Sequence, residues 1–337
     1  MKRRMFAAVL AVVALGAVAC GKAPDRTVQA QASPAYLAHA ADQTMADTGR
    51  YQLTVDVHAT HEGKAVDGTV TATGEYDTAS KSSHVTLDAG SLVQSMLSQA
   101  PPAMADSISK FLGDSDMKVQ IVQVGSDVYV QMPFLSQLTS MFGRFGGSTT
   151  TPTSDSWMKL DLSKMTDLGT SGIGTTDPSV FLKLLDGTKG DVRELGSSTI
   201  RGVDTKGYAV TFTLADALAR VSDAATRAKI QKLIDDTHMS KLLDIQIPLE
   251  IYVDADGLVR RVVYDFDLAD VAKELPTQPG VTPPDGTMTM KVTLDFFDFG
   301  AAVNIQAPPA SQVVQPPDLS KIVGSRNGLP FGQKDHN

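Results

Sequence analysis

The sequence predicts an α+β fold in which one large curved antiparallel β-sheet, an open half-barrel, wraps over several helices. Segments with alternating apolar and polar residues predict strands with one apolar and one wet face. Apolar stripes at helical spacing lie between these strands and need a buried partner, which the apolar sheet face supplies. With 42% hydrophobic residues and one cysteine, the fold is stabilised by a hydrophobic core, not by internal disulfides.

The strand prediction rests on segments with a repeat of two residues. The clearest are 51–59, 128–132, 208–214, 245–253 and 288–296. An Asp-Ala-Asp-Gly turn at 254–257 predicts a hairpin, and Gly-Ser-Asp at 125–127 predicts another. Pro248 lacks a main-chain N–H, so it predicts an edge strand or a bulge at its position.

Helices are predicted before and between the strands. The first spans residues 36–45, with Ser33 as its N-cap and Pro34 at its start. The other predicted helical segments are 92–112, broken at Pro101–Pro102, then 134–142, 178–185 and 214–243, the last as two helices.

The N-terminus has the pattern of an export signal. Lys2, Arg3 and Arg4 are basic, and residues 6–18 follow without a charge. This run is shorter than the roughly 20 residues that a membrane-spanning helix needs. Residues 1–19 are therefore predicted to be a signal peptide.

The signal ends in Ala17-Val18-Ala19-Cys20, which resembles a bacterial lipobox. That resemblance implies cleavage between Ala19 and Cys20 and lipid attachment to the Cys20 sulfur. The lipobox pattern prefers Leu where this chain has Ala17, and the alternative is an ordinary secretory signal that happens to precede a cysteine. Cys20 has no partner for a disulfide, which favours acylation. We expect a lipid-anchored protein on the extracytoplasmic face of the cell membrane.

The mature chain is predicted to contain one domain. Residues 20–33 are polar and form a tether, residues 34–319 form the domain, and residues 320–337 form a disordered tail. The net charge is −8 and no basic block follows the signal, which argues against a nucleic-acid partner and against membrane binding by charge alone.

No catalytic motif, metal site or cofactor site is predicted. His58 and His61 fall on opposite faces of a strand, which favours a solvated pair over a metal site. Asp254 and Asp256 are explained by turn chemistry without an ion. The only cysteine belongs to the anchor, so the sequence indicates a protein that is not an enzyme.

Several short motifs resemble the actinobacterial LppX_LprAFG lipoprotein family. They are YQLTV at 51–55, WMKLD at 157–161, VDADGLVRR at 253–261, FFDFG at 296–300 and APPA at 307–310. The resemblance implies an open half-barrel similar to the carriers LolA and LolB. It also implies a hydrophobic cavity that holds acylated lipids or glycolipids, and it brings no catalytic motif.

The predicted function is binding of an acylated lipid or glycolipid and its transfer across the envelope. Five apolar residues at helical spacing are the candidate cavity lining: Leu138, Met141, Phe142, Phe181 and Leu185. They could equally be plain core. The alternative function is a closed interaction or scaffold lipoprotein without bound lipid, which docks an envelope transporter or enzyme.

Overall fold

The structure is a computed structural model of the chain. It describes residues 33–61, 64–100, 102, 105–106, 109, 117–133, 153–161, 182, 191–219, 224–236, 240–267 and 287–314. The predicted signal peptide, most of the tether and the predicted tail lie outside these residues.

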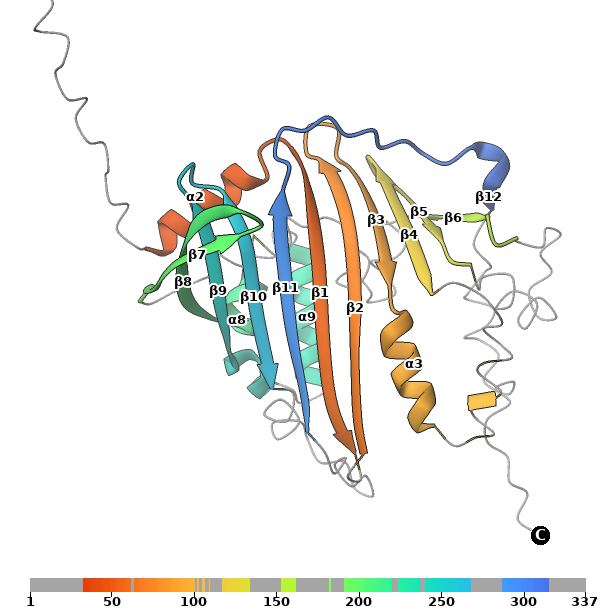
Figure 1. Ribbon diagram of the computed structural model, residues 1–337, viewed down its shortest axis with the longest axis horizontal. Coiled ribbons are helices and arrows are strands. Elements are labelled where there is room, and N and C mark those ends of the chain that lie inside the picture. Colours follow the sequence, from red (N-terminus) through yellow and green to blue (C-terminus); the bar gives the residue numbers. More distant parts are fainter. Residues whose placement is uncertain are drawn as a thin grey trace, which may run out of the picture.

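The described strands form one open, curved sheet of 12 strands, which confirms the predicted sheet (Figure 1). Its order is β12-β6-β5-β4-β3-β2-β1-β11-β10-β9-β8-β7. All neighbouring strands are antiparallel except β12 and β6, which are parallel. The strand bounds are β1 Thr48–His61, β2 Lys64–Asp77, β3 Ser82–Asp88, β4 Lys118–Val124, β5 Asp127–Gln131, β6 Trp157–Asp161, β7 Arg193–Ile200, β8 Val203–Thr213, β9 Gln246–Asp254, β10 Val259–Asp267, β11 Met288–Phe297 and β12 Val313–Val314.

The helices agree only in part with the expectation that several of them fill the sheet. The described helical segments are α2 Pro34–Thr44, α3 Gly90–Gln99, α8 Leu214–Ala219, α9 Ala224–Asp236 and the 3-10 turns η3 Ser240–Asp244 and η4 Ala310–Gln312. The prediction of two helices within 214–243 is confirmed, and α8 and α9 lie behind the sheet in the view of Figure 1. The predicted helices at 134–142 and 178–185 lie outside the described residues, except Leu182.

Helix α2 begins as its sequence predicts and closes one end of the sheet. The Tyr36 N–H donates to Ser33 Oγ over 3.2 Å, which confirms the N-cap. In the last turn, Thr44 Oγ1 accepts from the Val259 N–H over 2.8 Å, and the Thr44 carbonyl accepts from Tyr76 Oη over 2.9 Å. These buried bonds join the helix to β10 on one side and to β2 on the other.

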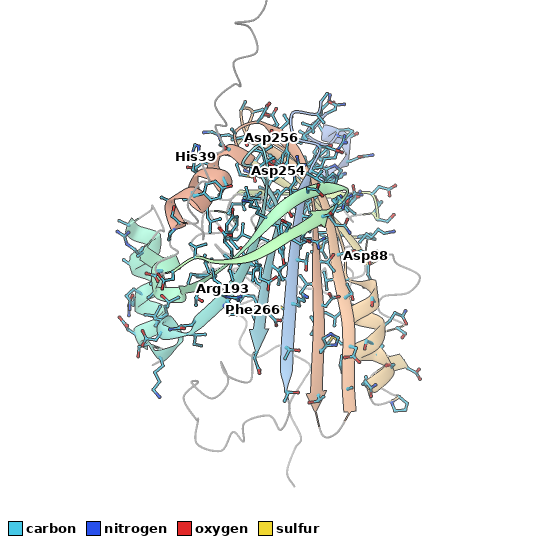
Figure 2. The ribbon with its side chains drawn as sticks, turned by 60° about the vertical axis from the view of Figure 1, so that its left-hand side comes forward. His39, Asp88, Arg193, Asp254, Asp256 and Phe266 are labelled. Atoms are coloured by element: carbon cyan, nitrogen blue, oxygen red, sulfur yellow. The ribbon has the colours of Figure 1, made fainter. Side chains whose placement is uncertain are left out.

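The turn between β9 and β10 is held by one carboxylate. Asp254 Oδ1 accepts from the Asp256 N–H at 3.0 Å and from the Leu258 N–H at 2.9 Å. Its other oxygen pairs with Arg260. The predicted hairpin is confirmed. Main-chain N–H groups of the turn donate hydrogen bonds to the Asp254 carboxylate, as turn chemistry predicts. Figure 2 shows Asp254 and Asp256 at this turn, close to α2.

The prediction that Pro248 marks an edge strand or a bulge is wrong, because β9 lies between β8 and β10. Pro248 pairs with Thr211 of β8. The register with β10 starts only at Leu249, which lies opposite Tyr264. Toward β10, proline therefore stands one residue beyond the paired part of the ladder.

The strand register aligns the apolar positions of neighbouring strands on one face, which we call the inner face. One row runs from Leu294 of β11 to Leu53 of β1 and Ala72 of β2. Another row runs from Val85 of β3 to Ile121 of β4, and the next strands continue it with Val130 and Met158. The opposite, outer face carries mainly polar residues, such as the Arg261–Asp295 pair.

Candidate functional site

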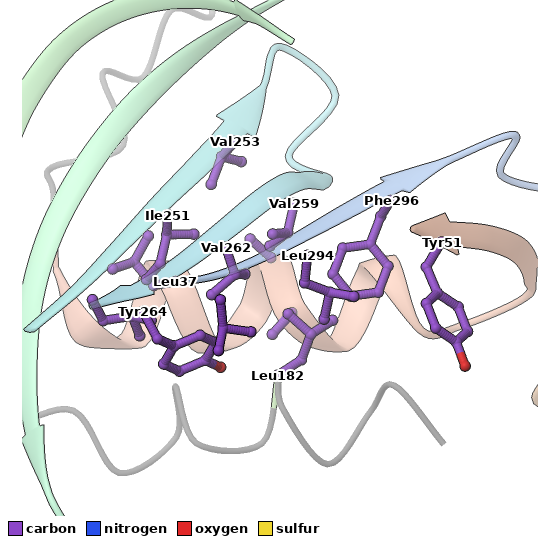
Figure 3. Packing of buried hydrophobic residues seen from close by; sticks show 14 of the residues in the cluster. Leu37, Tyr51, Leu182, Ile251, Val253, Val259, Val262, Tyr264, Leu294 and Phe296 are labelled. Carbon is purple, nitrogen blue, oxygen red and sulfur yellow. The ribbon is translucent and has the colours of Figure 1, made fainter. Parts of the chain in front are cut away.

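The inner face is tightly packed over β8 to β11. The side chains there interlock with Leu37 of α2 and with Leu182 (Figure 3). The strand residues of this packed region are at most 5% exposed: Tyr208, Val210, Phe212, Ile247, Leu249, Ile251, Val253, Val259, Val262, Tyr264, Leu294 and Phe296. This part of the inner face is an ordinary solid core.

The same apolar face continues over β1 to β6 and the first residues of β11, where its cover is incomplete. Ten residues there are only half-buried, and we call them the half-covered region: Val55, Val66, Val70, Leu87, Val119, Ile121, Val130, Met158, Leu160 and Met290. Met288, at the start of β11, is 39% exposed. None of the described inner-face residues of β3 to β6 is charged. The region therefore offers aliphatic surface that solvent still reaches.

Helix α3 borders the half-covered region because one residue of β2 lacks a side chain. A Cβ atom on Gly68 would stand 2.6 Å from Cα of Leu92, so only glycine allows this close approach of helix and sheet. Gly68 lies opposite Val57 on the inner face. Leu97 of α3 is half-buried and Met96 is 57% exposed. The helix thus adds further uncovered apolar surface beside the sheet.

Strand β10 passes from the packed region at Tyr264 to a less buried position at Phe266. Desolvation by burial raises the pKa of Tyr264 above its ordinary value, as expected for a phenol in apolar surroundings. The Tyr264 ring stacks on Phe266, with centroids 6.1 Å apart, and Phe266 is half-buried. Figure 2 places Phe266 farther along β10 from the Asp254 turn. Burial along this strand therefore decreases with distance from α2.

The residues proposed from the sequence as sites are outside the part that the structure describes. This holds for Ala19 and Cys20 and for the candidate lining Leu138, Met141, Phe142, Phe181 and Leu185. Their roles stay predictions. The half-covered region is formed by strands and not by the helices that carry the sequence-derived candidates. Of its residues, Val130 could be predicted from the alternation in β5. The short strands β4 and β6 gave weaker signals.

Neither metal binding nor acid–base chemistry is supported at the histidine pair. His58 is exposed, and its Nδ1 lies 2.8 Å from Oδ1 of Asp67 across the β1–β2 ladder. Within the described ranges, no group of three His, Cys, Asp or Glu could hold a metal ion. In the same part of the chain, no helix has the length and apolar character to cross a bilayer.

No known protein family matches the chain, and neither does any curated protein. Among solved structures, lipoprotein LppX of Mycobacterium tuberculosis is 12% identical over 81% of this chain and 100% of that chain, with a TM-score of 0.36. LprF of Mycobacterium bovis is 11% identical over 82% and 99%, with a TM-score of 0.39. A LolA superfamily protein of Nitrosomonas europaea is 11% identical over 82% and 94%, with a TM-score of 0.22.

These proteins are of the type that the sequence motifs resemble, which agrees with the predicted resemblance. Their TM-scores lie below 0.5, so no property of these proteins is transferred to this chain.

Proposed function

We propose that the protein is a cell-envelope lipoprotein that binds the acyl chains of a lipid or glycolipid against the half-covered region and helps to transfer it. The observation that carries the proposal is the contrast along one continuous apolar face. The packed region holds Ile251 at 0% exposure, whereas Ile121 and Leu160, on the same face, remain half-exposed.

An acyl chain matches the chemistry of this surface. The half-covered region has aliphatic side chains and, over β3 to β6, no charge with which to orient a polar ligand. Each methylene moved from water to an apolar site contributes about 0.8 kcal/mol. Ten buried methylenes would contribute about 8 kcal/mol before the entropic costs of association, enough for stable but reversible retention.

Membrane anchoring through Cys20 fits this function. The anchor is supported by the lipobox-like sequence before Cys20, the only cysteine of the chain. A carrier held near the bilayer can take up and release its lipid without the lipid having to diffuse through water. No step of this process requires a catalytic residue.

The test compares two valines of β4 that lie on opposite faces. Val119 is on the inner face opposite Leu87, and Val124 is on the outer face opposite Ser82. Both are half-buried. Wild-type protein and the variants Val119→Trp and Val124→Trp are purified from the native host and examined by native mass spectrometry and solvent extraction.

We expect wild type and Val124→Trp to carry lipid in a fixed ratio, and Val119→Trp to lose it while keeping its melting temperature. An indole at Val119 would occupy the space of the acyl chain. Wild type without lipid, together with a large fall in melting temperature for Val119→Trp, would mean that the region is solid core. The interaction-protein alternative would then stand.

The same assay tests a separate proposal, that the five lining residues predicted from the sequence contact the lipid. Substitution by Trp at a subset of Leu138, Phe142, Phe181 and Leu185 is expected to abolish lipid retention in a folded protein. Met141 is the fifth candidate.

A further inference from the structure

A pocket lies on the outer face of the sheet, opposite the face that carries the half-covered region. Residues 301–309, which we call the strap, leave β11 and pass toward β12 at the far edge of the sheet (Figure 1). Between the strap and the outer face of β3, β4 and β6 is a pocket of about 370 Å³. This volume is at the lower end of the range for small-molecule sites.

The floor of the pocket combines one aromatic ring with a chain of polar side chains. It is formed by His84, Gln120, Val122 and Trp157. Gln120 Oε1 lies 3.3 Å from His84 Nε2, and Gln120 Nε2 donates to Gln131 Oε1 over 2.7 Å. These bonds fix the amide, while Trp157 remains half-buried at the start of β6.

The rim is made of amides of the strap and of η4. Gln306 Nε2 donates to Asn304 Oδ1 over 2.9 Å, and both residues are exposed. Within the described residues, the Asn304 amide N–H groups and the Gln306 amide oxygen have no hydrogen-bond partner in the protein. Gln312 adds a third amide, and Pro308 adds an apolar wall.

The lining selects a neutral ligand that is both apolar on one face and rich in hydroxyl groups. No Asp, Glu, Lys or Arg is among the described residues that line the pocket, and His84, the one titratable side chain there, is engaged with Gln120, so the lining favours a neutral ligand. An amide both donates and accepts, as a hydroxyl does. The electron-rich face of an indole attracts the positive edges of C–H groups.

We propose that this pocket binds a neutral pyranose ring, stacked on Trp157 and held at its hydroxyls by Gln120, Asn304 and Gln306. The site is independent of the proposed lipid function, because it lies on the other face of the sheet. The ring can belong to a free oligosaccharide or to a glycolipid headgroup.

Trp157 is the only tryptophan in the chain, so intrinsic fluorescence reports on this pocket alone. The full chain, in detergent, is titrated with neutral methyl glucoside, galactoside and mannoside, and with glucuronate as the charged comparison. A second arm uses phosphatidylcholine vesicles with and without a galactolipid, which separates a headgroup from a soluble sugar. We expect at least one neutral pyranose, free or as headgroup, to change the emission, and glucuronate to bind more weakly.

The matched variants are Gln306→Ala, in the rim, and Gln246→Ala, which changes another exposed glutamine, at the start of β9. Loss of one hydrogen bond is expected to weaken sugar binding about fivefold in Gln306→Ala. Gln246→Ala should bind as wild type does. The proposal is overturned if no neutral pyranose changes the emission in either arm. It is also overturned if Gln306→Ala binds as tightly as Gln246→Ala, or if glucuronate binds as well as the neutral sugars.

Discussion

Two isoleucines on the same sheet face should respond very differently to truncation. Ile251 is 0% exposed between Tyr208 and Val262, whereas Ile121 is half-buried between Val85 and Val130. Ile251→Ala removes about 2.5 kcal/mol of transfer free energy and leaves a cavity, for a total of about 4 kcal/mol. In lipid-free protein, Ile121→Ala should cost only about 1 kcal/mol, because solvent already reaches its side chain.

The free energy of unfolding is measured by urea denaturation of protein extracted with solvent to remove lipid. If both isoleucine variants lose about 4 kcal/mol in the lipid-free state, the half-covered region is a closed core and Ile121 does not lie on a surface open to lipid. If lipid is restored, only the Ile121 variant should also lose ligand-induced stabilisation.

Three further predictions concern the anchor, alkaline stability and the outer face. Cys20→Ala should leave an unprocessed precursor or a soluble released protein, and unchanged partitioning into detergent would refute the anchor. Burial raises the pKa of Tyr208 to about 12 and also raises the pKa of Tyr264. The two neutral phenols therefore contribute fully to the free energy of unfolding below about pH 10, and this contribution is lost as the pH rises toward 12. Tyr264→Phe should make this fall shallower in urea midpoints taken across that range, and an unchanged slope would contradict the assignment. Arg261→Ala should cost about 1–2 kcal/mol, because Asp295, bound at 2.6 and 2.7 Å, loses its partner. Replacing both residues should recover part of the loss, and strict additivity would argue against the pair.

The sheet could be predicted where alternation is regular. The segment 51–59 corresponds to β1, and 245–253 corresponds to β9, because a half-buried strand needs apolar residues at every second position. Strand β7 gave no such signal. Its register with β8 shifts between Glu194 and Gly196, and this bulge disrupts the alternation.

The candidate sites could not be predicted in full, because they depend on which segments cover which part of the sheet. Alternation places Val130 and Ile251 on an apolar face but cannot distinguish a packed residue from a half-covered one. The pocket on the outer face could not be predicted for the same reason. Val122 is only 5% exposed there, and it lines the pocket beside the strap, whose residues carry no regular pattern.

Lipid binding to the half-covered region is tested most directly by locating the acyl chain on the protein. Methyl groups are labelled for NMR, and lipid-free protein is loaded with a phospholipid that carries a spin label within its acyl chain. We expect strong broadening of the Ile121 and Val130 methyl signals, with little effect on Ile251 in the packed region or Val263 on the outer face. Broadening confined to Val263, or no broadening at saturating lipid, would contradict it.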